Sequence, residues 1–84
     1  MYSIIYKKTS EKELLHLPKE YAIKVRDAIN RLAVNPFPRG CKKSSGSDNA
    51  YRVRIGTYRV IYIVESSRLI ILIIKIAHRR EAYR

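Results

Sequence analysis

Residues 51–62 have the sequence YRVRIGTYRVIY, in which two similar halves are joined by Gly56 and Thr57. In each half apolar or aromatic residues alternate with other residues, which is the pattern of a half-buried β-strand. A two-residue loop that begins with glycine favours a type II′ turn, and this turn fixes the register of the two strands. The stretch therefore predicts a β-hairpin with two chemically different faces.

The predicted register gives the hairpin an apolar face and a cationic face, because directly paired residues point to the same side. The apolar face is expected to carry Tyr51, Val53, Ile55, Tyr58, Val60 and Tyr62. The cationic face is expected to carry Arg52, Arg54, Arg59 and Ile61. Arg54 then lies opposite Arg59, which destabilises the sheet unless an anion binds there. A solvated outer face is the alternative, although solvated faces usually mix both signs of charge.

Length and composition predict one globular domain that spans residues 1–84 and attracts polyanions. Hydrophobic residues make up 46% of the chain, as in folded rather than disordered proteins. Lysine and arginine number 18 against 7 acidic residues, which gives a net charge of +11. Nucleic acid is the commonest polyanion in a cell, and an anionic membrane surface is the weaker alternative.

The sequence predicts a cytoplasmic protein that needs no metal or other cofactor. No signal-peptide pattern is present, and the longest apolar run, Leu69–Ile74, is too short to span a bilayer. Cys41 is the single cysteine and there are only two histidines, so no disulfide framework or metal-ligand spacing is found. The glycines do not form a nucleotide-binding motif.

The segments before the hairpin predict a strand followed by two helices. Residues 2–6 have the β-branched and aromatic content of a short strand. Ser10 and Glu13 have the spacing of a capping box for a first helix, with Thr9 as a competing cap. A second helix is predicted to begin near Pro18 and to end before Pro36. Its expected buried stripe consists of Val25, Ala28, Ile29 and Leu32.

The remaining segments predict a loop and one more strand. Residues 36–50 are rich in Pro, Gly and Ser, which is typical of a loop. Residues 69–77 predict a third consecutive antiparallel strand after a turn at residues 65–68. Its continuous apolar run leaves the facing of its side chains open, because a shift of one residue would invert every one of them.

The C-terminal residues HRREAYR supply groups that the hairpin lacks. Arginine binds phosphate through its planar guanidinium, histidine exchanges protons near neutral pH, and tyrosine can stack on a base. These groups suit RNA cleavage, and a metal would be unnecessary because RNA carries its own nucleophile, the 2′-hydroxyl. The candidate constellation is Arg52, Arg54, Arg59, His78, Arg79 and Tyr83, with Lys42 and Lys43 adding to the basic surface. A frayed, solvated tail and a non-catalytic RNA binder are the alternatives.

The succession of YRVRIGTYRVIY and LIILIIKIAHRREAYR resembles the RelE/ParE superfamily of type II toxins, and in particular its RelE-like branch. The resemblance implies an α+β, microbial-RNase-like fold with an N-terminal strand, a helical hairpin and then a three-stranded antiparallel meander. The strands form one sheet, and the helical hairpin packs on one face of it. The resemblance also implies a metal-independent endoribonuclease that cuts messenger RNA in the ribosomal A site by 2′-hydroxyl attack. The implied partner is a cognate antitoxin with an acidic C-terminal segment.

The same resemblance assigns roles to individual residues. Arg59 and Arg79 fall where the family has arginines that stabilise the transition state, and Tyr83 falls where it has a base-stacking tyrosine. Arg52 and Arg54 replace lysines of well-studied members, and arginine effectively cannot lose its proton. The proton-transfer role is therefore expected to move to His78.

Two other functions stay open on the sequence alone. A ParE-like toxin shares the fold but inhibits DNA gyrase and has no nuclease activity. An inactive member of the superfamily would bind nucleic acid and antitoxin without cleaving RNA. His78 and Tyr83 together favour the endoribonuclease.

Overall fold

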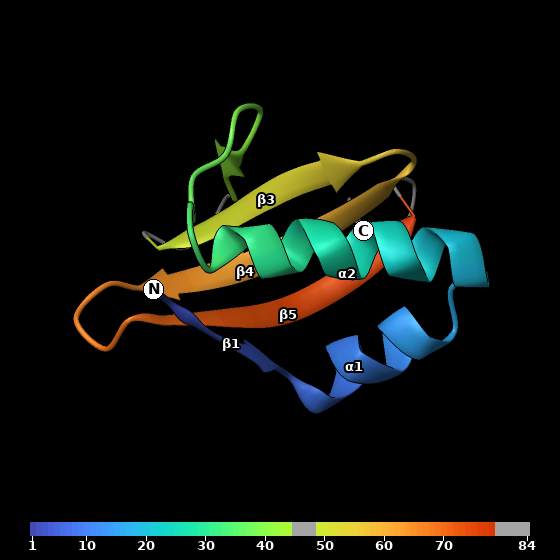
Figure 1. Cartoon of the computed structure of the whole chain (residues 1–84), viewed down its shortest axis with the longest axis horizontal. Helices are drawn as coiled ribbons and strands as arrows, with labels where there is room; N and C mark the ends of the chain where they lie inside the picture. Colours follow the sequence, from blue (N-terminus) through green and yellow to red (C-terminus); the bar gives the residue numbers. More distant parts are fainter. Residues whose placement is uncertain (45–48, 79–84) are drawn as a thin grey trace.

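The computed structural model describes residues 1–44 and 49–78 of the chain. Its elements are β1 (Ser3–Tyr6), α1 (Lys8–Leu15), α2 (Lys19–Leu32), β2 (Lys42–Lys43), β3 (Ala50–Ile55), β4 (Tyr58–Glu65) and β5 (Ile70–His78). The strands form one sheet in the order β1-β5-β4-β3-β2, with α2 lying across one face (Figure 1). The predicted α+β fold is therefore confirmed, including the meander of β3, β4 and β5.

The sheet differs from the predicted antiparallel one in two details. β1 pairs in parallel with β5, because the two helices carry the chain back before the sheet continues. β2 pairs with the start of β3 and lies in the segment that was predicted to be a loop. A two-residue strand has too little pattern to be recognised among the neighbouring Pro, Gly and Ser residues.

The predicted stripe of α2 packs on the sheet and forms the core. Val25 and Ile29 are 0% exposed and Leu32 is 1% exposed, while Ala28 is half-buried. Each such aliphatic side chain contributes about 1.5–3 kcal/mol relative to an exposed position. They meet Val60 and Tyr62 of β4, with Ile71, Ile73 and Ile76 of β5 beside them. Neither helix of the described residues has the length and apolar character needed to cross a bilayer.

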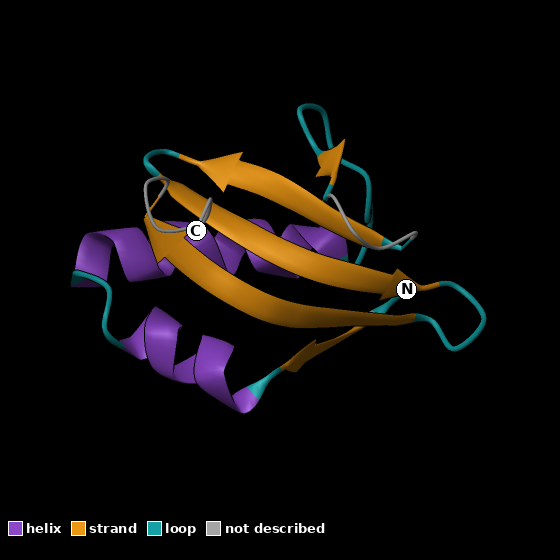
Figure 2. Ribbon diagram, turned by 180° about the vertical axis from the view of Figure 1, so that it is seen from behind, coloured by secondary structure: helices purple, strands orange, loops and turns teal. Residues whose placement is uncertain are grey.

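The opposite face of the sheet is not covered by α2 (Figure 2). The register places the arginines of the hairpin on this face, near its turn. It also places partly exposed apolar side chains of β1, β4 and β5 there, which are Ile5, Ile61, Ile63, Ile70 and Leu72. This uncovered face therefore joins a cationic region to an apolar strip.

The capping box predicted for the first helix is wrong, because Ser10 and Glu13 bind β5 instead. The helix begins at Lys8, and Ser10 is fully buried with its Oγ 2.8 Å from the Ile73 carbonyl oxygen. The Ile76 N–H donates to Glu13 Oε1 at 2.9 Å. β1 pairs with β5 only as far as Ile73. Where β1 ends, the Ser10 and Glu13 side chains therefore supply hydrogen-bond partners for the backbone of β5.

The facing of β5 is settled by an irregularity in its pairing with β4. Ile61 pairs with Lys75 but Tyr62 pairs with Ile73, so Ile74 is an extra residue that forms a β-bulge. Before the bulge Ile71 and Ile73 face the core, and after it Ile76 does so. The bulge thus changes which residues of the strand face α2.

Candidate nucleic-acid interface

The hairpin places its three arginines on the uncovered face of the sheet. Arg54 pairs directly with Arg59, and Arg52 pairs with Ile61, as the sequence predicted. The turn between the strands depends on Gly56, whose φ of 61° lies in the left-handed region that glycine adopts readily. Arg54 Nε donates a hydrogen bond to the Gly56 carbonyl oxygen at 3.1 Å, which holds this side chain beside the turn.

A cleft of about 320 Å³ lies over these arginines, and we call it the arginine cleft. Its described lining consists of Arg39, Gly40, Lys42, Arg52, Val53, Arg54 and Arg59. Five of these side chains are cationic, and the described lining includes no carboxylate. Cationic groups that converge on one concave surface raise the local concentration of anions, and guanidinium groups bind phosphate oxygens in pairs.

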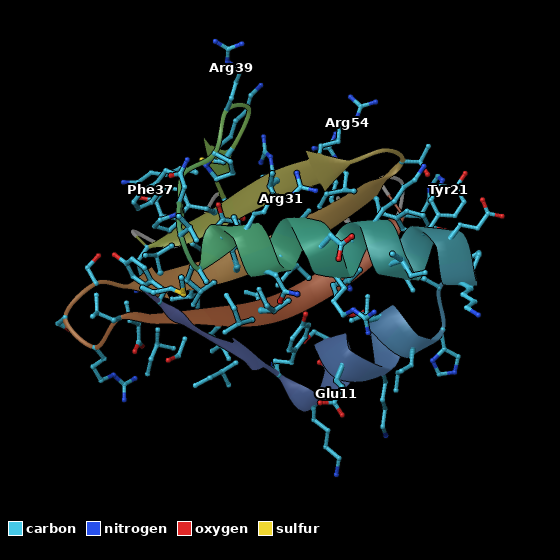
Figure 3. The ribbon with its side chains drawn as sticks, viewed as in Figure 1. Glu11, Tyr21, Arg31, Phe37, Arg39 and Arg54 are labelled. Atoms are coloured by element: carbon cyan, nitrogen blue, oxygen red, sulfur yellow. The ribbon has the colours of Figure 1, made fainter. Side chains whose placement is uncertain are left out.

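The loop before β3 contributes two of the five cations. Lys42 pairs with Arg52 and therefore lies on the uncovered face with the arginines. Lys43 pairs with Tyr51 and lies on the face that α2 covers. Arg39 was not among the predicted site residues, although it lines the cleft. Arg39 and Arg54 both project beyond the outer edge of β3 (Figure 3). The positive charge of Arg39 and its position three residues before Lys42 were the available sequence signals for a place in the cleft. Only the pairing of β2 shows that the loop turns toward the cleft.

Tyr62 holds the start of this loop against the core. It is 0% exposed, and its hydroxyl donates to the Pro36 carbonyl oxygen at 2.8 Å. Its ring stacks on Tyr51 at a centroid distance of 6.1 Å, and Phe37 meets Tyr51 edge-on at 5.0 Å. Burial, with a smaller contribution from the nearby Cys41, raises the pKa of Tyr62 far above its ordinary value. The side chain therefore remains a neutral donor.

We expect this burial to make the protein sensitive to alkali. A tyrosine whose folded pKa is raised contributes stability that is complete below its unfolded pKa of about 10 and is lost as pH rises toward the folded value. Burial also raises the pKa of Tyr6, with Arg26 opposing it. For Tyr62, the free energy of unfolding should fall above pH 10 by about 1.4 kcal/mol per pH unit. Urea titrations at several alkaline pH values measure this slope, which Tyr62→Phe should reduce; an unchanged slope would contradict the prediction.

His78 lies away from the arginine cleft. It pairs directly with Tyr58, which places it on the face that α2 covers. The His78 ring meets the Tyr58 ring edge-on, with centroids 5.8 Å apart, and Tyr58 contacts Tyr21 of α2 at 5.4 Å. The described lining of the arginine cleft does not include His78.

The structure thus assembles part of the predicted constellation. It brings Arg52, Arg54 and Arg59 together with Lys42, and it adds Arg39. Lys43 and His78 lie on the other face, whereas Arg79 and Tyr83 lie outside the described residues. The assembled cleft can bind phosphate, but arginine effectively cannot act as a base. Residues 1–44 and 49–78 contain no cluster of His, Cys, Asp and Glu suited to holding a metal ion.

Comparisons with known proteins agree with this architecture. Residues 4–83 match the family model described as the ParE toxin of the type II toxin-antitoxin system, parDE. A relative named RelE1 from Methanocaldococcus jannaschii is 42% identical over 76 residues, which cover 87% of this chain and 84% of that relative. These matches establish the family.

Two solved structures have the same fold. A chain of the archaeal RelE-RelB complex from Pyrococcus horikoshii OT3 superposes with a TM-score of 0.82 at 32% identity, and the match covers 93% of this chain and 94% of that one. The isolated E. coli RelE toxin superposes with a TM-score of 0.82 at 16% identity, covering 99% and 96%, and shows likeness of fold alone. The chain therefore belongs to the RelE/ParE superfamily of toxins of type II toxin-antitoxin systems.

Proposed function

We propose that this toxin is a metal-independent endoribonuclease that cleaves messenger RNA in the ribosomal A site and so inhibits translation. The observation that supports it best is the arginine cleft, in which five cationic side chains converge and the described lining has no carboxylate. The 2′-oxygen of one nucleotide attacks the adjacent phosphorus, and the bond from phosphorus to the 5′-oxygen breaks. Guanidinium groups stabilise the additional negative charge that develops on the phosphate.

In this proposal the cleft binds the RNA backbone and the C-terminal segment supplies the proton transfer. Arg59 and Arg79 stabilise the transition state. Arg52, Arg54 and Lys42 hold neighbouring phosphates. His78 exchanges a proton with the 2′-hydroxyl or with the leaving 5′-oxygen, and Tyr83 stacks on a base. Because His78 and Arg59 lie on opposite faces of the sheet, the RNA would have to pass around the edge of the sheet where β4 begins and β5 ends to meet both.

We further propose that a cognate antitoxin with an acidic segment inhibits the toxin. The matched archaeal structure is a RelE-RelB complex, and an acidic partner would balance the net charge of +11. The apolar strip beside the arginines offers a second surface that a wrapping protein could cover. Because its proposed substrate is messenger RNA on the ribosome, the toxin is also proposed to act in the cytoplasm.

A ParE-like function is the second candidate. It is favoured by the family model, which describes the ParE toxin, and by the separation of His78 from the arginine cleft. In that case the protein inhibits DNA gyrase and cleaves no RNA. An inactive member that only binds nucleic acid and antitoxin is the third candidate, and it predicts no growth arrest on expression.

Expression of the wild-type toxin without an antitoxin should arrest growth and produce messenger RNA cut in frame within codons. His78→Ala and Tyr83→Ala should each abolish the arrest and the cuts if these residues act as proposed. Primer extension locates the cuts, and a reporter of DNA damage is measured in the same cultures. DNA damage without cleaved messenger RNA would favour the gyrase inhibitor and would contradict the endoribonuclease.

The role of His78 has a separate check in single-turnover cleavage on programmed ribosomes. The wild-type rate should depend on pH between about 5 and 8, the range in which histidine titrates. A flat profile would remove His78 from proton transfer without excluding nuclease activity.

A further inference from the structure

We propose that Lys75 of β5 is a further phosphate-binding residue for RNA, and that it exchanges its contact with Glu13 for an RNA phosphate when RNA binds. In this role, which rests on the proposed function, Lys75 extends the phosphate site from the arginine cleft across β4 onto β5. Glu13 holds the lysine while RNA is absent.

The register of the sheet places Lys75 on the uncovered face. Lys75 pairs directly with Ile61 of β4, and Ile61 pairs directly with Arg52 of β3. Directly paired residues point to the same side, so these three side chains form one row across the sheet. The apolar run of β5 left this facing open in the sequence, and the pairing after the bulge decides it. The strand therefore adds a lysine to the face that carries the arginines.

Lys75 is a close neighbour of Arg59 on this face. Arg59 pairs with Arg54 of β3 on one side and with Ala77 of β5 on the other. Arg52 and Lys75 each stand two residues before these partners, so both are diagonal neighbours of Arg59, about 7–8 Å away. Long side chains span this separation, and the short side chain of Ala77 does not divide them. Lys75 thus has the same relation to Arg59 from β5 that Arg52 has from β3.

Lys75 also completes a row of cations that crosses the strands. The described lining of the arginine cleft comes from β3, β4 and the loop before them, and Lys75 lies beyond it on β5. Its side chain is 41% exposed. The row runs from Lys42 through Arg52 and Ile61 to Lys75 and spans three strand spacings, about 14 Å. An RNA backbone that crosses the strands would meet a cation at both ends of this row.

Glu13 of α1 is the partner of Lys75 in the structure. One carboxylate oxygen lies 3.7 Å from Lys75 Nζ, and the other accepts from the Ile76 N–H at 2.9 Å. α1 lies beyond β5 on the side away from β4, so this contact draws the ammonium group away from Arg59 (Figure 1, Figure 2). Ion pairs between such partly exposed groups are weak. The lysine can therefore leave Glu13 at little cost.

An RNA phosphate competes well with Glu13 for this lysine. An ammonium group carries three donors on a flexible stem, so it can turn from one anion to another. A phosphate between Lys75 and Arg59 would contact two cations at once, whereas Glu13 contacts the lysine from the far side of β5. Converging cations raise the local attraction for a phosphate. The exchange therefore favours RNA.

Binding of an RNA that cannot be cleaved tests this role on the isolated protein. Oligouridine with 2′-O-methyl groups lacks the attacking hydroxyl, and fluorescence anisotropy measures its dissociation constant at several salt concentrations. Lys75→Gln should weaken binding by about three- to tenfold at low salt. It should also reduce the slope of log affinity against log salt by about 0.7, the value for one phosphate contact with a single strand. Lys75→Arg should bind within about twofold of the wild type, because it keeps the charge.

Arg68→Ala is the matched control for the loss of charge. It also removes a cation that pairs with a glutamate, but at the exposed turn between β4 and β5. This variant should keep the salt slope of the wild type. Equal effects of Lys75→Gln and Arg68→Ala would overturn the inference, because total charge would then explain them. An unchanged slope in Lys75→Gln would overturn it as well.

The exchange of partners has a separate test in Glu13→Gln. The glutamine keeps an oxygen for the Ile76 N–H but removes the charge that competes with phosphate. It should tighten binding of the same oligonucleotide by about threefold in the wild type, and by less than about 1.5-fold in Lys75→Gln, because the two residues act through one contact. An equal gain in both backgrounds would contradict the exchange.

The outcomes separate this role of Lys75 from the proposed nuclease activity. Binding that depends on Lys75 as expected, without cleavage on ribosomes, would contradict the endoribonuclease alone. Cleavage on ribosomes together with an unchanged salt slope in Lys75→Gln would overturn the role of Lys75 alone. No measurable binding of the oligonucleotide by the wild type would also overturn that role.

Discussion

Arg59→Ala should lower the rate of messenger RNA cleavage by about 100- to 1,000-fold, as expected when one donor to a developing negative charge is lost. Arg59 lies in the middle strand of the meander, where it pairs with Arg54 of β3 and Ala77 of β5, and it lines the arginine cleft. The substitution also removes the repulsion from Arg54 across the strand pair. The free energy of unfolding should therefore change by less than about 1 kcal/mol.

Single-turnover cleavage on programmed ribosomes and urea unfolding together check this result. Arg68→Ala is the matched control, because it removes the same charge at the exposed turn after β4, where Arg68 pairs with Glu65. The control should retain activity close to that of the wild type. Equal loss in both variants would mean that total charge, rather than the arginine cleft, determines the rate. A loss of folding in Arg59→Ala would instead assign that arginine a structural role.

Tyr62→Ala should destabilise the fold by about 3–5 kcal/mol, the usual cost of removing a large buried aromatic side chain. Tyr62 is fully buried between α2 and the sheet, and its hydroxyl holds the Pro36 carbonyl oxygen. Small domains have about 5–15 kcal/mol of total stability, so this one change could remove most of it. The loss should appear as a lower urea midpoint and a lower Tm.

Tyr62→Phe separates the hydrogen bond from the packing. It keeps the ring but leaves the Pro36 carbonyl without this donor, which should cost about 1–3 kcal/mol. Because the loop after Pro36 carries Arg39 and Lys42, the variant should also bind a short RNA more weakly while it remains folded. Unchanged stability in both Tyr62 variants would show that this residue does not anchor the loop.

The hairpin could be predicted from sequence because its information is local. A two-residue loop beginning at Gly56 fixes the register, and the register alone determines that Arg54 faces Arg59. The stripe of α2 was equally clear, because Val25, Ile29 and Leu32 recur at helical spacing. In both cases the pattern lies within one element or across one turn.

The parts that could not be predicted depend on contacts between distant segments. Ser10 and Glu13 have the spacing of a local cap, yet both bind β5, more than sixty residues later in the chain. Where β1 ends, the backbone groups of β5 need hydrogen-bond partners, and meeting this need outweighs the local motif. Arg39 likewise joined the site only because β2 turns the loop toward β3.

The side of the sheet on which His78 lies could not be predicted for a third reason. The sequence grouped His78 with the arginines by the chemistry of its side chain and left the facing of the last strand open. The pairing of His78 with Tyr58 places it on the face of α2. An unbroken apolar run does not reveal which side of the sheet its residues face.

The bulge at Ile74 gives β5 one residue more than its pairing with β4 requires. Tyr62 pairs with Ile73 and Ile61 pairs with Lys75, so the ladder on each side of Ile74 is regular. Deleting Ile74 should therefore close the bulge and leave Ile76 and His78 on the face that they occupy now. Both this deletion and substitutions at Ile74 should leave the core packing of Ile76 nearly unchanged.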